Sequence, residues 1–110
     1  MNGDGVTLEE FGKIHLRVAR IREAKPHPDA DKLLVLTIET GSAEKQIVAG
    51  IARHYRPEDL AGRFIVVVDN LQPATLRGVV SEGMLLAAQD EQGLALVAPD
   101  RPVAPGATVR

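Results

Sequence analysis

Short apolar segments, separated by turn-forming residues about every ten positions, are the feature that most restricts the fold of this chain. Seven prolines and ten glycines are distributed over its 110 residues, and they interrupt nearly every run of apolar side chains. Short segments of this kind, with one short helix among them, are typical of a small β-barrel or sandwich and not of an alternating α/β sheet. The sequence therefore predicts an all-β fold.

The N-terminal third shows a helix signal followed by an alternating segment. Residues 7–10 (TLEE) match a capping box, which predicts a short helix that ends at Gly12. From Lys13 onward apolar and polar residues alternate as in a half-buried strand. The alternation slips at residues 20–21, which predicts a β-bulge, and residues 26–29 (PHPD) are expected to end the strand in a loop.

The remaining two thirds predict further strands joined by turns. Residues 63–69 carry five consecutive apolar side chains, so we expect this strand to be central and covered on both faces. Residues 70–78 read as a long loop, and the prolines and glycine of residues 99–106 as an irregular tail. The other expected elements are strands at 32–39, 46–49, 84–88 and 94–98 and a one-turn helix at 57–62.

Length and composition predict a single domain over residues 1–110. Hydrophobic residues make up 45% of the chain and charged residues 25%, which is enough apolar material for one core. No apolar run approaches the roughly 20 residues that a membrane span needs, and no signal-peptide pattern is present. Cysteine is absent. We therefore expect a cytoplasmic protein that does not enter membranes.

The charge distribution leaves two interpretations open. The formal net charge is −2, whereas a nucleic-acid binder needs clustered lysine and arginine. A basic face on an acidic body would satisfy this requirement, but ordinary solvated charges explain the same pattern equally well. The basic cluster would contain Arg17, Arg20, Arg22, Lys25 and Lys32.

No catalytic or metal-binding constellation has the required spacing. His27, Asp29 and Asp31 are ligand-type residues at alternate positions, but they lack a fourth group. We expect Asp29 to cap the local turn with its carboxylate, and His27 and Asp31 to face water. Ser81 is preceded by a glycine three positions away, whereas a nucleophile elbow needs glycines two positions away on both sides. We expect no enzyme activity, no cofactor and no metal.

The polar segment 70–78 and the shortage of aromatic residues bear on binding. A loop on a rigid barrel is a common place for binding residues, although a plain connection fits this segment as well. Single-strand binders stack bases on exposed aromatic side chains, and here the aromatic residues are Phe11, Tyr55 and Phe64. The shortage of aromatic side chains, together with the arginine, lysine, asparagine and serine residues present, favours recognition of a folded RNA through phosphate and 2′-hydroxyl contacts.

Six motifs, in order and over nearly the whole chain, resemble the signature of one family, the tRNA-binding domain. This domain occurs at the C-terminus of many methionyl-tRNA synthetases, as free-standing dimeric proteins, and in polypeptides related to endothelial monocyte-activating polypeptide II. The resemblance covers residues 11–109. The motifs are 11–18 (FGKIHLRV), 27–33 (HPDADKL), 46–50 (QIVAG), 70–71 (NL), 76–79 (LRGV) and 81–88 (SEGMLLAA).

The resemblance implies a fold, a function and a set of site residues. The fold would be a five-stranded OB-type β-barrel with N- and C-terminal extensions. The protein would be a homodimer that binds the outer corner of the L-shaped tRNA without catalysis. Asn70 and Ser81 would hydrogen-bond to the RNA backbone or sugar, Arg77 would neutralise phosphate, and Met84 would pack against ribose. Lys32 and Arg17 would add flanking positive charge.

Alternative assignments remain within the same family. The chain resembles both free-standing members and the terminal domain of a methionyl-tRNA synthetase, so an aminoacyl-tRNA synthetase is a candidate partner. The second candidate function is that of a secretion-related, chaperone-like protein of the same fold, which binds peptides through an apolar groove. The motifs at 70–71, 76–78 and 81–84 resemble the synthetase-associated branch more closely.

Overall fold

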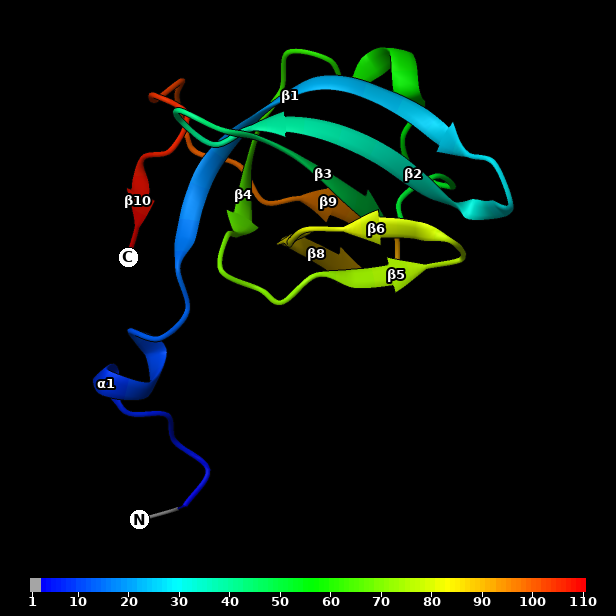
Figure 1. Ribbon diagram of the computed structural model, residues 1–110. Helices are drawn as coiled ribbons and strands as arrows, with labels where there is room; N and C mark the ends of the chain where they lie inside the picture. The colour runs from blue at the N-terminus through cyan, green and yellow to red at the C-terminus, as the bar shows by residue number, and fades with distance from the viewer. Residues whose placement is uncertain (1–2) are drawn as a thin grey trace.

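The computed structural model describes residues 3–110, and β-strands dominate this part of the chain (Figure 1). The main sheet has the order β3-β2-β1-β4-β7, and β10 also pairs with β1. Two small hairpins, β5-β6 and β8-β9, are attached to it. The elements are α1 (Leu8–Phe11), β1 (Leu16–His27), β2 (Ala30–Glu39), β3 (Glu44–Ala49), η1 (Pro57–Asp59), β4 (Phe64–Val68), β5 (Ala74–Leu76), β6 (Val79–Ser81), β7 (Met84–Leu85), β8 (Ala87–Asp90), β9 (Gly93–Leu96) and β10 (Thr108–Val109).

Strand β1 organises the sheet because it changes partner along its length. Its first residues, from Leu16 to Arg20, pair with β4, and the residues from Arg20 to His27 pair with β2. The register shifts between Ile21 and Glu23, which confirms the predicted bulge at this point of the strand. A bulge bends a strand and increases its twist. Figure 1 shows β1 and β2 arching together over the rest of the molecule.

The core lies inside this curved sheet. Alternate residues of β1, β2 and β3 point inward, and each buried large aliphatic side chain contributes about 1.5–3 kcal/mol to folding. Val66, Val67 and Val68 are all buried, so β4 is covered on both faces as its apolar run predicts. The core cluster is Ala19, Ile21, Leu34, Leu36, Ile38, Ile47, Ala49, Ile51, Leu60, Ile65 and Val67.

Residues 81–83 join the two ends of the main sheet. The Gln46 amide of β3 donates to Glu82 Oε1 (2.9 Å), and the Glu82 amide donates back to the Gln46 carbonyl (2.8 Å). The same segment leads into β7, whose Met84 pairs with Val68 of β4. The sheet is thereby curled into a barrel-like shape, and the prediction of an all-β, barrel-like fold is confirmed.

The N-terminal helix forms as its capping box predicts. The Glu10 amide donates to Thr7 Oγ1 and the Thr7 amide donates to Glu10 Oε1, both at 3.0 Å. The hydrogen bond from the Thr7 backbone lowers the pKa of the Glu10 carboxyl below its ordinary value. The helix ends before Gly12. None of its own residues is buried, and no helix within residues 3–110 is long and apolar enough to cross a membrane.

Strands extend into two segments that were expected to be loops. β1 continues through Pro26 to His27, because beyond Arg20 its outer edge pairs with no strand of the described chain, and a proline is tolerated at such an edge. Residues 70–78 contain β5 and the turn of the β5-β6 hairpin. That turn is made by Arg77 (φ 52°) and Gly78 (φ 89°). Two consecutive residues with positive φ are typical of a two-residue hairpin turn, although such turns usually have the sequence Asn-Gly or Asp-Gly and not Arg-Gly.

The C-terminal third also differs in detail from the expected strands. The predicted strand 84–88 is divided into β7 and β8, and the predicted strand 94–98 ends at Leu96. The expected irregular tail 99–106 leads into β10, which pairs Thr108 and Val109 with the start of β1.

Replacement of Gly83 by alanine should destabilise the protein by about 1–3 kcal/mol, because overpacking a dense region forces its neighbours apart. A Cβ atom on Gly83 would lie 2.9 Å from the Val68 carbonyl oxygen, at the junction of the barrel. Urea unfolding followed by circular dichroism measures the change.

Gly50→Ala is the matched control, because a Cβ atom there meets only a Leu33 side-chain carbon at 3.9 Å. Its stability should stay within about 0.5 kcal/mol of the unmodified protein. Equal unfolding midpoints for Gly83→Ala and the unmodified protein would contradict this account of the junction.

Candidate nucleic-acid interface

Much of the positive charge near the start of the chain is held in ion pairs. Arg22 Nη1 lies 2.7 Å from Glu44 Oε2, and Arg20 Nη1 lies 3.9 Å from Glu39 Oε1. A cation beside a carboxylate contributes less to the field that attracts phosphate. The hypothesis of one basic face over residues 17–32 is therefore only partly met.

A hollow of about 440 Å³ beside the β1-β2 turn gathers three cations. Lys32, Arg53 and Arg77 line it, and within the described chain none of these three cations forms an ion pair. All three are exposed. We call this site the basic hollow; its other lining residues are Asp29, Ala30, Asp31 and Leu33.

Three separate elements carry the cations of the basic hollow. Lys32 belongs to β2, and its carbonyl accepts a hydrogen bond from the Ala52 amide (3.2 Å), which holds the loop of Arg53 against β2. Arg77 occupies the β5-β6 turn, and its Nη2 donates to the Asp29 carbonyl (3.2 Å). Because backbone contacts position all three residues, the cations share one site although 45 residues separate Lys32 from Arg77 in sequence.

His27 connects two of these elements from beneath the surface. Its side chain is buried, its Nδ1 accepts from the Asp29 amide (2.9 Å), and its Nε2 lies 2.9 Å from the Leu76 carbonyl. The expectation that His27 faces water is therefore wrong. The turn is held by the His27 imidazole, which accepts from the Asp29 amide, and not by the Asp29 carboxylate as expected. No group of three possible metal ligands converges within residues 3–110.

Arg17 lies in a different cluster, at the opposite end of β1. Its Nε is 3.3 Å from Asp69 Oδ2, and its Nη1 donates to the Gly106 carbonyl (3.2 Å). Lys45 Nζ contacts the same carboxylate at 2.8 Å. Arg17 therefore ties β1 to the end of β4 and to the C-terminal segment, and Asp69 offsets its charge.

Asn70 has a similar anchoring position. Its Oδ1 accepts from the His15 amide (2.8 Å), and its Nδ2 donates to the Lys13 carbonyl (2.7 Å). Both functional groups of the side chain thus hold residues 13–15 against the end of β4. The side chain remains exposed, but its hydrogen bonds serve the fold.

Ser81 is buried, whereas Met84 is exposed. Ser81 is 4% exposed, and its hydroxyl accepts from the Val48 amide and donates to the Gly83 carbonyl, both at 2.9 Å. This geometry gives Ser81 a structural role at the barrel junction, with its hydroxyl bonded to the backbone of the chain itself. Met84 is 43% exposed and is available for contact.

The six predicted site residues therefore do not form one cluster. Lys32 and Arg77 meet at the basic hollow, whereas Arg17 and Asn70 lie near the start of β1. With a rise of about 3.3 Å per residue, the two ends of this 12-residue strand are about 35 Å apart along its path. Sequence reasoning missed Arg53, which follows a short strand and a glycine without any recognisable motif.

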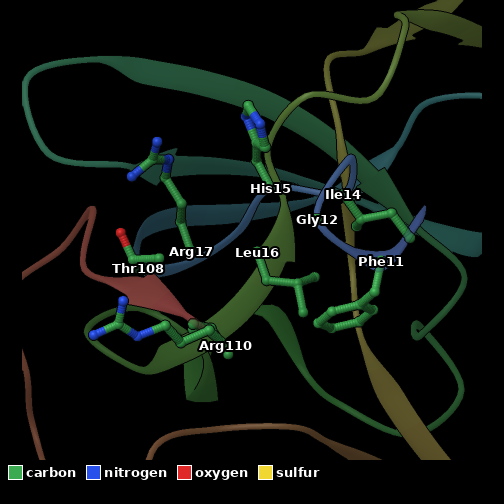
Figure 2. A pocket seen from close by; sticks show the side chains of 9 residues that line it. Phe11, Gly12, Ile14, His15, Leu16, Arg17, Thr108 and Arg110 are labelled. Carbon is green, nitrogen blue, oxygen red and sulfur yellow. The ribbon is translucent and has the colours of Figure 1, made fainter. Parts of the chain in front are cut away.

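A second hollow lies between α1 and β10 (Figure 2), and we call it the apolar cleft. Figure 2 shows the ring of Phe11 beside Leu16, while Arg17 and Arg110 lie farther from the ring. The helix projects from the barrel (Figure 1) and leaves Leu8 89% exposed. Figure 2 also places Ile14 next to this cleft.

Residues 16–108 match the family model described as "Putative tRNA binding domain". The chain belongs to this tRNA-binding domain family. The match covers all the strands of the main sheet except the last residue of β10, together with the whole basic hollow. The resemblance inferred from the six sequence motifs is confirmed.

Relatives of this tRNA-binding domain include parts of methionine–tRNA ligases. The chain is 50% identical to the enzyme of Pyrococcus furiosus over 105 residues, which cover 96% of the chain and 14% of that protein. It is also 50% identical to the Thermotoga maritima enzyme over 106 residues, 96% of the chain and 17% of that protein. The chain thus spans about one sixth or less of these relatives.

Solved structures of similar shape cover the whole barrel of this tRNA-binding domain. A MetRS-related protein from Pyrococcus horikoshii has a TM-score of 0.90 and 34% identity, covering 97% of this chain and 99% of the other. The chaperone CsaA from Picrophilus torridus has a TM-score of 0.89 and 29% identity, covering 96% of this chain and 100% of the other. The same fold therefore serves proteins with different names.

Asn70→Ala should loosen residues 13–15 at the end of β4, because it removes two of the hydrogen bonds that hold them and leaves the one from the Asp69 amide to the His15 carbonyl (2.8 Å). We expect a loss of about 1 kcal/mol in stability and faster hydrogen exchange at the His15 amide. Gln72→Ala is the control, since Gln72 is exposed and nearby in sequence. Unchanged exchange at His15 in Asn70→Ala would show that these bonds do not order the segment.

Proposed function

We propose that this tRNA-binding domain acts without catalysis and recognises the folded shape of tRNA through the basic hollow. The observation that carries the proposal is that three cations from three elements, none of them ion-paired in the described chain, outnumber the two aspartates in one site of a chain that belongs to this family. Phosphate contacts give affinity without sequence information, which suits recognition of many tRNAs by shape. Residues 1–110 would form one OB-type unit in the cytoplasm.

The aromatic residues support shape recognition over stacking of single-stranded bases. Tyr55 is partly buried, its hydroxyl accepts from the Leu96 amide (3.0 Å), and Arg63 lies over its ring at 5.3 Å from the centroid. Phe64 is also partly buried. Phe11 lies on α1 beside Leu16 at the start of β1 (Figure 2), at the end of this strand opposite the basic hollow. The cations of the basic hollow therefore have no exposed row of aromatic rings beside them on the barrel.

Each predicted site residue receives a role consistent with its position. Lys32, Arg53 and Arg77 would neutralise phosphates, and the exposed Met84 would pack against ribose. Arg17 and Asn70 would support the interface by fixing the start of β1 and could add contacts at its margin. The buried hydroxyl of Ser81 would support the interface indirectly, by holding the barrel junction.

The domain would operate either as a free-standing protein or together with a methionyl-tRNA synthetase. The relatives named as methionine–tRNA ligases contain this domain as a small part of a longer protein. A module that raises tRNA affinity works in both arrangements, because attachment only raises its effective concentration near the catalytic part.

A homodimer would explain the projecting helix. Val6 and Leu8 are 71% and 89% exposed, and Phe11 and Ile14 add further exposed apolar surface next to the apolar cleft. Contiguous apolar surface of this kind favours association. A second copy would bury these side chains and present a second basic hollow to the same tRNA, which would double the phosphate contacts although each copy carries a net charge of −2.

Arg77→Ala and Arg53→Ala should each weaken tRNA binding and reduce the slope of log affinity against log salt by about one unit. Fluorescence anisotropy of labelled tRNA at several salt concentrations measures both quantities. The matched control is Arg101→Ala, since Arg101 is exposed and donates only to its neighbour Pro102. If all three variants lose the same affinity, net charge and not the basic hollow controls binding.

Leu8→Asp should convert the dimer to monomers, because a charge on α1 would be buried in the interface at a high cost. Analytical ultracentrifugation measures the mass in solution. Val80→Asp, at a 45% exposed position on β6, is the control and should leave the dimer intact. A monomeric unmodified protein would contradict the dimer, and the projecting helix would then need another partner.

A peptide-binding, chaperone-like function is the second candidate. The structural similarity to CsaA chaperones supports it, and so do the exposed Leu76 and Val80 on the β5-β6 hairpin. Titration with labelled tRNA, with single-stranded RNA of equal length and with an unfolded apolar peptide separates the candidates. Salt-sensitive preference for tRNA supports the first function, whereas peptide binding without preference for tRNA supports the second.

A further inference from the structure

The imidazole of His27 lies where the two turns that carry the basic hollow meet. It is 5% exposed, although histidine is usually found nearer the surface. One ring nitrogen contacts the backbone of the β1-β2 turn at Asp29, and the other contacts the backbone of β5 at Leu76. The ring therefore bridges parts of the chain that are 49 residues apart.

The two hydrogen bonds determine the form of the ring. The Asp29 amide is a donor, so Nδ1 must accept and cannot carry a proton. The Leu76 carbonyl is an acceptor, so Nε2 must carry the proton and donate. A doubly protonated ring would place an N–H group against the Asp29 N–H group. Only the neutral ring with its proton on Nε2 makes both bonds.

These bonds act on residues next to the cations. Leu76 directly precedes Arg77, and the Asp29 carbonyl accepts from Arg77 Nη2 at 3.2 Å. Asp29 also leads within three residues to Lys32 on β2. The bridge through the ring therefore sets the distance between the β5-β6 turn and the start of β2, and with it the separation of Arg77 from Lys32.

We propose that neutral His27 is a positioning residue for RNA binding: it does not touch RNA, and it holds Arg77 and Lys32 at the spacing that engages phosphates. This inference rests on the proposed function. A preorganised site loses less conformational entropy when it binds, which is the source of the gain in affinity.

Acid should weaken this bridge, because a second proton on the ring removes the acceptor for the Asp29 amide. Exposed histidines have the opposite effect on RNA affinity, since protonation gives them a positive charge that attracts phosphate. The charged side chains on the elements around the ring are Lys25 on β1, Asp29 and Asp31 after the turn, Lys32 on β2, Arg53 on the neighbouring loop and Arg77 on the hairpin.

The first test examines the ring directly and needs no RNA. Long-range ¹H–¹⁵N spectra of the unmodified protein at neutral pH distinguish the two tautomers and the protonated ring. We expect the proton of His27 on Nε2, and the Asp29 amide should lose its protection from exchange when the pH is lowered. A proton on Nδ1 at neutral pH would overturn the bridge, and this measurement stands even if substitutions at His27 prevent folding.

The second test measures tRNA affinity by anisotropy between about pH 8 and pH 5. Glutamine at position 27 can still donate towards Leu76, but its single amide group cannot at the same time take the place of Nδ1 as the acceptor for the Asp29 amide, and it does not titrate in this range. His27→Gln should bind about three- to tenfold more weakly at the alkaline end. The ratio of its affinity to that of the unmodified protein should rise as the pH falls. His15→Gln, an exposed histidine near the start of β1, is the matched control.

The outcomes separate this inference from the proposed function. If the unmodified protein binds tRNA and His27→Gln binds equally with the same pH profile, the positioning role is wrong while the proposed function stands. If the unmodified protein does not bind tRNA, both fail. If His27→Gln and His15→Gln change the pH profile alike, loss of a titrating charge accounts for the effect and the positioning role is wrong.

Discussion

The pairing of β1 with two different strands is the interaction on which the rest of the structure depends. Its first half is hydrogen-bonded to β4 and β10, its second half to β2, and the bulge after Ile21 turns the strand from one partner to the other. Because β1 is long and bent, β2 and β3 curve over the core and β3 reaches residues 81–83. The hydrogen bonds between Gln46 and Glu82 then join the ends of the sheet. Most buried side chains lie inside this ring, so the stability of the core depends on the curvature of one strand.

The two ends of β1 carry charge in different ways. At its start, Arg17 shares the carboxylate of Asp69 with Lys45, and Asn70 holds the backbone of residues 13–15. At its end, the cations of the basic hollow have backbone contacts but no ion pair in the described chain. Charge that already has a partner stabilises the fold, whereas unpaired charge on a rigid frame remains available to phosphate. An acidic protein can therefore still present a local site for RNA.

The residues that the sequence predicted for RNA contact occupy different positions in the structure. Lys32 and Arg77 were identified through the family motifs, and they do lie together. Arg53 was missed, because its position depends on the hydrogen bond between Ala52 and Lys32 and no local pattern marks it. Asn70 and Ser81 were assigned to RNA on the same motifs, yet their polar groups are bound within the chain. A motif shows that a polar side chain is required, but it does not show whether the partner is a ligand or the protein's own backbone.

The sequence by itself determined the all-β class, the capped N-terminal helix, the buried central strand and the family. These features follow from local periodicity, from capping chemistry and from ordered motifs, all of which are properties of neighbouring residues. Only the tertiary structure decided that residues 70–78 enter a hairpin, that His27 is buried, and that cations far apart in sequence share one hollow. Those features depend on contacts between distant segments, and a single buried imidazole can join such segments because burial gives each of its two ring nitrogens a backbone partner in place of water.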